Sequence, residues 1–353
     1  MDNVTDDRLT GNDAEGAQLL LSNAQYLIAT SGRAPSVHNS QPWRFRIGPE
    51  RAELWSDPRR RIWTDPLGRE MLISCGAALF GLRLAVRSLG YQPVVDLLPD
   101  PGRPQLLARL RVGRSAPLSP LEASMLRAVQ RRHTHRGPFE PRPLPPGLLV
   151  GLQDDAVKEG AELAIIRPGL MYDRLFRLAA SAARRGDLDP RARAAVRRWT
   201  RAAARDARRA PGRPGGDHES PDAEGIPATA LTVGSASPIR PGRLPQRDFD
   251  LGRNLGLLPA GGLPPAVTAI LLTQGDRRVD WLRAGQALDR LLLHAASEWV
   301  FASLHTQPIE DPVTRILIGS QLGLPGHPQL LMQLGMATVA PATARRPVAE
   351  LAD

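Results

Sequence analysis

The sequence predicts an α+β fold made of two similar halves, each with its own sheet, and with long helices packed between the sheets. The order helix, strands, helix, strands occurs twice along the chain. Two long apolar helices also align at an offset of 209 residues, which sets Gly76 against Gly285. The same offset pairs Ala78 with Ala287, Leu79 with Leu288, Leu82 with Leu291 and Leu84 with Leu293. This repetition favours an internal duplication, and the length of 353 residues suits about two domains of ~150 residues.

The first half is expected over residues 15–120. Apolar residues at helical spacing predict its opening helix, which ends at Gly32, and a loop with two prolines follows. A second, strongly apolar helix ends at Gly90, a residue suited to a C-terminal cap. The predicted elements are helix 15–32, strands 44–47 and 52–55, helix 69–89, and strands 94–98 and 106–112.

The second half is expected over residues 121–351. Its predicted elements are helix 121–129, strand 161–166, a helical region 171–199, strand 266–273, helices 281–296 and 313–322, and strand 329–334. Residues 206–247 are rich in Pro and Gly without any sustained period, which predicts a lid or a flexible insertion. The offset of 209 places Trp299 where the first half has Gly90. Because tryptophan adopts a left-handed cap poorly, this helix is expected to end differently or to continue further.

The formal net charge of +10 comes almost entirely from arginine, since Lys158 is the only lysine. Basic runs at 59–61, 131–132 and 184–209 raise the alternative of an arginine-rich nucleic-acid-binding protein. They lack interleaved aromatics and any recognisable helix-turn-helix or zinc-finger spacing, so we favour solvated surfaces. The polar, acidic N-terminus is unlike a signal peptide, and no apolar run was found that suits a bilayer. A single cysteine, Cys75, excludes a disulfide framework, and a cytoplasmic location is expected.

Several common catalytic sites are missing from the sequence. It contains no phosphate-binding Gly-x-x-x-x-Gly-Lys loop, no Gly-x-Gly-x-x-Gly after a strand and no Gly-x-Ser-x-Gly elbow. Cys75 lies on an apolar helix face, which favours a buried core residue over a nucleophile, and Lys158 is expected to be exposed. Arginines surround His133 and His135, so no metal site is predicted there, and His294 is expected to be a packed or surface residue.

Two groups of residues suit an anionic, planar ligand. Arg132, Thr134 and Arg136 alternate, so that an extended segment would present two guanidinium groups and a hydroxyl on one side, as a phosphate requires. The alternative is an exposed basic helix end. In the segment 35–43, prolines stiffen a loop that carries Asn39, whose amide can both donate to and accept from the edge of a heterocycle. The alternative there is a structural turn before a strand.

The loop 35–43, Pro-Ser-Val-His-Asn-Ser-Gln-Pro-Trp, is similar to the Pro-Ser-x-x-Asn-x-Gln-Pro-Trp motif of the FMN-dependent nitroreductase family. Residues 132–136 resemble that family's Arg-x-Ser-x-Arg phosphate segment, and residues 308–310 resemble its Pro-Ile-Glu turn. Together with the duplicated organisation and the segment Gly326-His327-Pro328-Gln329, these motifs resemble the actinobacterial Acg branch of NAD(P)H nitroreductases. The similarity extends from about Leu19 to Leu351 and lapses in the Pro/Gly-rich insertion.

The resemblance implies a nitroreductase-like fold in which two fused tandem halves form an intramolecular pseudo-dimer. The first half would supply the Pro-Ser-x-x-Asn loop and the second half the phosphate arginines, giving one complete FMN site. The protein would be monomeric in this sense, or would associate further as a homodimer. By this analogy Arg132, Thr134 and Arg136 hold the phosphate, and Arg345 or Arg346 adds a second phosphate contact. The remaining implied contacts are Pro35, Ser36 and Asn39 along the isoalloxazine and the backbone N–H groups of Glu310 and Asp311 at its N5 and O4 edge.

The implied function is an FMN-binding oxidoreductase that passes electrons from NADH or NADPH to a small-molecule acceptor, without a nucleic-acid or membrane partner. One departure from the family concerns Asp311, because a carboxylate turned inward there would oppose an anionic reduced flavin. A protein of the same fold that binds or sequesters flavin without efficient turnover is the alternative. No side chain is expected to act as a catalytic group of its own.

Overall fold

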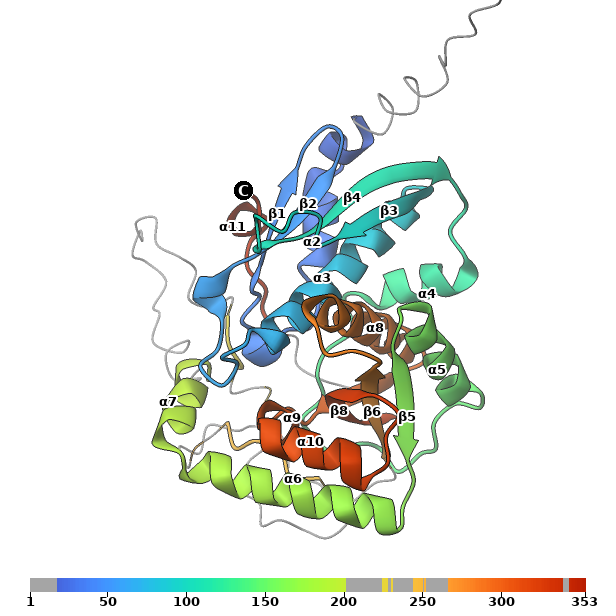
Figure 1. The fold of residues 1–353 in the computed structure, drawn as a ribbon. Helices are drawn as coiled ribbons and strands as arrows, with labels where there is room; N and C mark the ends of the chain where they lie inside the picture. The colour runs from blue at the N-terminus through green and yellow to red at the C-terminus, as the bar shows by residue number, and fades with distance from the viewer. Residues whose placement is uncertain are drawn as a thin grey trace, which may run out of the picture.

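The computed structural model describes residues 18–200, 224–227, 230, 244–249, 251, 266–338 and 343–353. Its first sheet has four antiparallel strands in the order β1-β2-β4-β3 (Figure 1). The strands are β1 (Trp43–Ile47), β2 (Ala52–Ser56), β3 (Tyr91–Leu97) and β4 (Leu106–Ser115). All four predicted strands of the first half are confirmed, with ends shifted by at most a few residues.

The second sheet has the equivalent order, β5-β6-β8-β7, and is also antiparallel. Its strands are β5 (Glu162–Ile166), β6 (Val267–Thr273), β7 (Val300–Leu304) and β8 (His327–Met336). The sequence reading missed β7. Its five residues, four of them fully buried and the last partly, form a short apolar run, and periodicity alone cannot assign a run of this length.

Two 20-residue helices, α3 (Arg69–Ser88) and α8 (Arg278–Ser297), lie against each other between the sheets (Figure 1). The offset of 209 residues relates both their first residues, 69 and 278, and their last, 88 and 297. Helix α3 packs on β2, β3 and β4, while α8 packs on β6 and β7. Each helix therefore closes the apolar face of one sheet, and the helix pair joins two cores into one molecule.

The expectation for Trp299 was wrong. Helix α8 ends at Ser297, and Trp299 adopts a left-handed backbone with φ of 59°, at the position where Gly90 has φ of 91° in the first half. The indole ring is 45% exposed, and the Arg131 guanidinium lies 4.5 Å from its centroid. A cation–π contact of about 0.5–1 kcal/mol helps to offset the strain of this backbone conformation.

The remaining helices surround this centre. The predicted helical region 171–199 is two helices, because Pro190 begins a new helix after the cap residue Asp189. The helices are α2 (Ala24–Ser31), η1 (Val37–Asn39), η2 (Pro58–Arg60), α4 (Pro120–Ala128), α5 (Leu148–Lys158), α6 (Leu170–Leu188), α7 (Pro190–Arg198), α9 (Gln307–Glu310), α10 (Pro312–Gln321) and α11 (Val348–Leu351). The start of the predicted first helix at residues 15–17 and most of the predicted insertion 206–247 lie outside the described residues.

Helix α3 is long and apolar enough to cross a membrane by length and composition, contrary to the expectation that no such segment exists. Within the protein, 83% of its apolar window is buried. The apolar surface of α3 is therefore already used by the sheet, α2 and α8, as in the core helix of a globular fold.

Candidate functional site

Four arginines from distant parts of the chain meet beside α8. Arg33 follows α2, Arg132 and Arg136 follow α4, and Arg345 lies in the C-terminal segment. Arg132 and Arg345 both donate to the carbonyl oxygen of Arg33, at 3.1 and 3.2 Å. We call Arg33, Arg132, Arg136 and Arg345 the arginine cluster.

The arginine cluster holds buried donors that no other described group satisfies: Nε of Arg33, Nη1 of Arg132 and Nε of Arg345. The carboxylate that acts on Arg132 and Arg345 is Asp289, which is 2% exposed on α8. Burial lowers the pKa of all four arginines, that of Arg136 to about 10, and burial raises the pKa of Asp289 to about 7. The cluster therefore has an excess of positive charge and unused donors, which suits a phosphate dianion.

The segment that carries two of these arginines is held against the second sheet. His135 donates its backbone N–H to the Ala302 carbonyl at 2.8 Å, and Thr134 forms a bridge with the same residue of β7. As a result Thr134 and Arg136 line a cavity, while Arg132 is buried beside Arg33. The segment 132–136 thus contributes side chains both to the cavity and to the arginine cluster.

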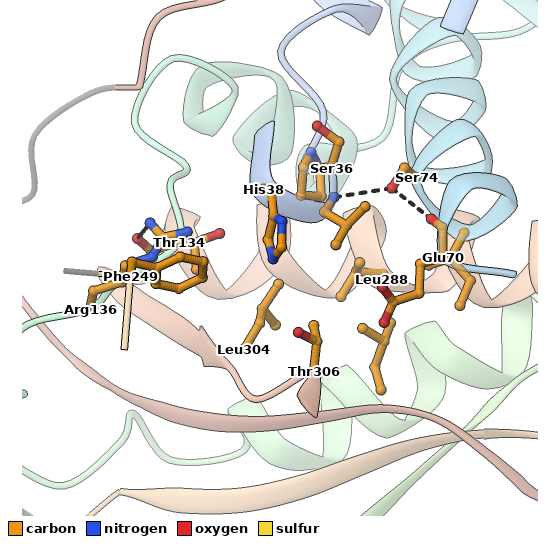
Figure 2. A pocket seen from close by; sticks show the side chains of 14 residues that line it. Ser36, His38, Glu70, Ser74, Thr134, Arg136, Phe249, Leu288, Leu304 and Thr306 are labelled. Carbon is orange, nitrogen blue, oxygen red and sulfur yellow. Dashed lines mark hydrogen bonds between the residues drawn. The ribbon is translucent and has the colours of Figure 1, made fainter. Parts of the chain in front are cut away.

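This inner cavity has a volume of about 70 Å³ (Figure 2). It lies between the loop 35–39, the start of α3, and the ends of β7 and β8. The lining residues that matter below are Pro35, Ser36, His38, Glu70, Thr134, Arg136 and Phe249. Two of the three predicted loop contacts, Pro35 and Ser36, are therefore at the cavity.

Hydrogen bonds hold the loop in an uncommon conformation. His38, Asn39 and Gln41 all have positive φ, between 48° and 57°. The Ser36 hydroxyl accepts from the Gln41 N–H at 3.0 Å, and the Ser74 hydroxyl on α3 accepts from the Val37 N–H at 3.2 Å. Left-handed residues at a cavity are a recurring feature of binding sites, because the surrounding structure must compensate for their strain.

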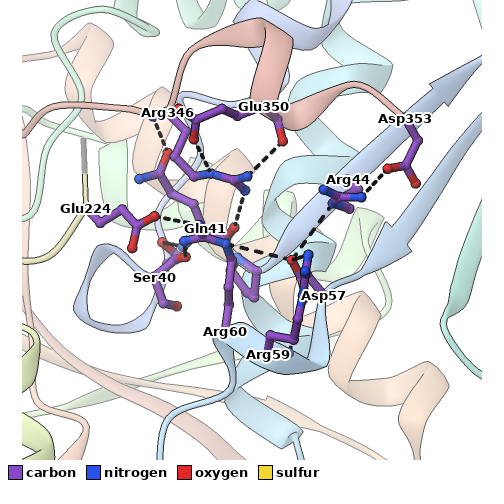
Figure 3. A network of polar contacts seen from close by, with 12 residues as sticks. Ser40, Gln41, Arg44, Asp57, Arg59, Arg60, Glu224, Arg346, Glu350 and Asp353 are labelled. Carbon is purple, nitrogen blue, oxygen red and sulfur yellow. Dashed lines mark hydrogen bonds and ion pairs between the residues drawn. The ribbon is translucent and has the colours of Figure 1, made fainter. Parts of the chain in front are cut away.

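Asn39 does not line the inner cavity. Its side-chain amide donates to the carbonyl oxygens of Gly225 and Ala344, each at 3.1 Å. The C-terminal segment is joined to the same loop through Arg346, whose N–H donates to the Gln41 side-chain oxygen at 2.8 Å and whose guanidinium bonds to Glu350 (Figure 3). Of the two predicted alternatives, Arg345 thus lies in the arginine cluster and Arg346 in this structural network.

Phe249 enters the inner cavity from the segment 244–249. Its ring meets that of His38 edge-on at 5.4 Å, and the Arg136 guanidinium lies 5.6 Å from its centroid. Burial lowers the pKa of His38 to about 3, so this imidazole is neutral, and neither of its ring nitrogens has a hydrogen-bond partner among the described residues. The neutral ring and Phe249 together give the cavity an apolar wall.

A larger cavity, of about 550 Å³, lies on the other side of Glu70, between the loop 63–69 and helices α6, α9 and α10. Two buried charged groups, Arg247 and Glu310, form an ion pair in its wall at 2.5 Å. Burial of the Glu310 carboxyl group favours its neutral form. The positive charge of Arg247 outweighs this effect, so the pKa of Glu310 is lowered. We call this space the outer cavity.

Asp311 points away from the inner cavity. Its carboxylate accepts from the Val313 N–H at 3.2 Å as the N-cap of α10, accepts from the Thr314 hydroxyl at 2.7 Å, and pairs with Arg185. Burial opposes ionisation, but the Thr314 and Arg185 bonds outweigh it and lower the pKa of Asp311. The Asp311 carboxylate is therefore bonded to α10 and Arg185 rather than turned into the inner cavity.

The other residues singled out from the sequence have structural surroundings. Cys75 is buried, its thiol donates to the Pro42 carbonyl, and burial raises its pKa, so the predicted core role is confirmed. Lys158 is exposed, as predicted, and lies 3.7 Å from Asp155. His294 bonds to the same carboxylate at 2.6 Å.

Sequence reasoning missed Arg33, His38, Glu70, Asp289 and Phe249. Glu70 and Asp289 had a usable signal, because each is a carboxylate on a helix that is otherwise largely apolar, and buried charges are uncommon unless they have a role. Arg33 and Phe249 had none, since only the folding of distant segments brings Arg33 to the arginine cluster and Phe249 to the inner cavity.

No protein-family model matches the chain. It is 32% identical over 335 residues to "Putative NAD(P)H nitroreductase Rv3131" of Mycobacterium tuberculosis, covering 93% of this chain and 90% of that protein. It is 29% identical over 329 residues to "Putative NAD(P)H nitroreductase acg" of the same organism, covering 90% and 92%. A crystal structure of a nitroreductase with bound FMN from Bacteroides fragilis aligns with 63% of this chain and 94% of that chain, at 12% identity and a TM-score of 0.35.

Proposed function

The chain belongs to the family of these NAD(P)H nitroreductases, and we propose that it is an FMN-dependent oxidoreductase that transfers electrons from NADH or NADPH to a small-molecule acceptor. The observation that carries the cofactor is the arginine cluster. Its unused donors on Arg33, Arg132 and Arg345 are buried where an anion with several oxygens would satisfy them.

In this proposal the phosphate of FMN binds the arginine cluster, and Thr134 adds a hydroxyl between the cluster and the inner cavity. The isoalloxazine lies along Pro35 and Ser36. The backbone N–H groups of Glu310 and Asp311, expected at its N5 and O4 edge, donate instead to the carbonyl oxygens of Thr306 and Gln307 at 2.8 and 3.4 Å, so they are not assigned to the flavin. Bound FMN supplies the redox chemistry, since it can take up a pair of electrons from a nicotinamide and release it to another acceptor. Asn39 serves the site by tying the loop to residues 225 and 344.

The inner cavity must enlarge for this ring. Its volume of about 70 Å³ is well below the ~300 Å³ at which small-molecule pockets begin. Phe249 is the side chain that we expect to yield, because its ring occupies the wall of the inner cavity between His38 and the Arg136 guanidinium. The proposal therefore includes a displacement of Phe249 when the cofactor enters.

We further propose that residues 15–120 and 121–351 are two fused halves of a pseudo-dimer. The equal strand order of the two sheets and the 209-residue offset between α3 and α8 support this. The loop 35–43 belongs to the first half and Arg132 to the second, so one chain supplies the whole site. Arg345, from the C-terminal segment that returns to β1, completes the phosphate contacts.

The test is a visible spectrum of the purified full chain after incubation with FMN and desalting, repeated anaerobically with NADH and with NADPH. The proposal expects retained flavin absorption that bleaches with at least one nicotinamide and returns when 1,4-benzoquinone is added. If the flavin is retained but stays oxidised, the protein is a flavin-binding protein and not a reductase. A chain that retains no flavin would overturn the cofactor assignment.

A further inference from the structure

Glu70, the second residue of α3, lines the inner cavity (Figure 2) and also lines the outer cavity. Its side chain is 7% exposed. The outer cavity, about 550 Å³ in volume, is large enough for many water molecules. Glu70 therefore borders both the larger and the smaller space.

One oxygen of this carboxyl group is unused. Oε1 of Glu70 lies 3.4 Å from Nη2 of Arg69, a long contact, and Oε2 has no hydrogen-bond partner among the described residues. A buried carboxyl oxygen without a partner is costly, unless the group is protonated or bonded to a ligand. The position is thus built for a group that gives or accepts a hydrogen bond inside the cavities.

The charged groups that face Glu70 leave it without a strong cationic partner. Asp65, from the loop before α3, and Glu310, from α9, are both negative neighbours. Arg247 is bound to Glu310 at 2.5 Å, and Arg69 donates mainly to the backbone and side chain of Gln329, at 2.8 and 3.2 Å. Because each of these arginines is also bonded to another group, neither fully compensates Glu70. Burial of the carboxyl group, followed by the charge of Glu310, raises the pKa of Glu70 well above its usual value.

We propose that Glu70 is the proton donor of the reaction, delivering a proton to the acceptor bound beside the flavin and recovering it from water in the outer cavity. This inference rests on the proposed function. NAD(P)H gives up two electrons and one proton as a hydride equivalent, whereas an acceptor A that becomes AH₂ gains two electrons and two protons. The second proton leaves the Glu70 carboxyl group and forms an O–H or N–H bond on the acceptor. The resulting carboxylate then takes a proton from water, so that the net reaction is NAD(P)H + H⁺ + A giving NAD(P)⁺ + AH₂.

The first test needs no cofactor. Infrared spectra of the purified full chain at pH 7 are compared for wild type, Glu70→Gln and Glu159→Gln. Glu159 is the matched control, because it is equally buried but paired with Arg83 and Arg290, away from both cavities. The carbonyl band of a protonated carboxyl group, identified by its shift in D₂O, should weaken in Glu70→Gln alone. An unchanged band in Glu70→Gln would show that Glu70 holds no proton and would overturn the inference.

The second test separates the two half-reactions by stopped flow, with NADH or NADPH as donor and 1,4-benzoquinone as acceptor. Reduction of the FMN-loaded chain should be unchanged in Glu70→Gln, since that step needs no added proton. Reoxidation by the quinone should slow about 100-fold and lose its solvent deuterium isotope effect. Glu70→Asp, which keeps the carboxyl group, should recover part of the rate.

The outcomes distinguish the inference from the function beneath it. If wild type and Glu70→Gln are reoxidised at equal rates, Glu70 is not the donor even though the reductase function stands. If Glu70→Gln and Glu70→Asp lose flavin or structure equally, the residue is structural and the inference fails. If the wild-type protein binds FMN but neither NADH nor NADPH reduces it, the proposed function is overturned. Proton delivery by Glu70 then fails as well, whatever the infrared spectra show.

Discussion

Gly76 of α3 and Gly285 of α8 face each other where the two central helices cross. A Cβ atom on Gly76 would lie 2.2 Å from the Leu282 carbonyl oxygen and 3.0 Å from the Cα of Gly285. A Cβ atom on Gly285 would lie 2.0 Å from the Ile73 carbonyl oxygen and 2.8 Å from the Cα of Gly76. The pair equated by the sequence repeat is therefore also the contact at which backbone meets backbone.

This contact predicts that Gly285→Ala destabilises the protein, although alanine favours helices by about 1 kcal/mol. The added methyl group meets backbone atoms of α3 that cannot turn away, so the helices must separate. We expect a net loss of about 2 kcal/mol or more in the free energy of unfolding, measured by urea denaturation. Gly319→Ala in α10 is the control, because its Cβ would meet only Pro328 at 3.6 Å. A stable Gly285→Ala variant would show that the crossing is looser than described.

The arginine cluster predicts that loss of its arginines weakens the binding of FMN much more than that of a flavin without a phosphate. Arg132→Ala combined with Arg136→Ala removes two charge-assisted contacts of ~1.5–3 kcal/mol each, so affinity for FMN should fall by about 100-fold or more. Affinity for riboflavin, which lacks the phosphate, should change little. Fluorescence titration with both flavins measures this, and Arg131→Ala, at the exposed Trp299 ring, is the control. An equal loss of affinity for FMN and riboflavin would show that the phosphate does not bind the arginine cluster.

Asp289 predicts a pH dependence of stability. Burial raises its pKa in the folded protein to about 7 from the ordinary 3.8, so between these values the folded chain binds more protons than the unfolded chain. The contribution of Asp289 to the free energy of unfolding therefore falls as pH rises from about 4 to 7, by at most about 1.4 kcal/mol per pH unit, and is constant above 7. Urea titrations at pH 5 and 7.5 should show a larger loss for wild type than for Asp289→Asn. Parallel losses in both proteins would mean that Asp289 ionises normally.

The position of Phe249 in the inner cavity predicts that removal of its ring strengthens FMN binding. If its ring must leave the inner cavity before FMN enters, Phe249→Ala removes that penalty and should raise FMN affinity by roughly tenfold, about 1.4 kcal/mol. The association rate, followed by quenching of flavin fluorescence, should increase with it. Trp299→Ala removes an exposed aromatic ring outside the inner cavity and serves as the control. Weaker FMN binding by Phe249→Ala would instead make the ring part of the flavin site.

Local sequence patterns predicted the two central helices, the strands β1 and β2 that follow the loop 35–43, and the segment that carries Arg132, Thr134 and Arg136. Such features depend on the spacing of apolar residues and on caps, which neighbours in the chain supply. The same patterns were insufficient for β7, whose five residues carry no period, and for Trp299, whose left-handed backbone accompanies a cation–π contact with Arg131.

The sequence by itself determined the repeated architecture and the loop and arginine motifs of the candidate site. Only the tertiary structure decided that Arg132 and Arg345, from distant parts of the chain, donate to the same backbone carbonyl oxygen, that of Arg33. It also decided that Asn39 ties segments together, that Asp311 caps α10, and that Glu70 lies between two cavities. The physical reason is that burial, cavity shape and pairing of charges arise from surfaces brought together across the whole chain, which no local spacing encodes.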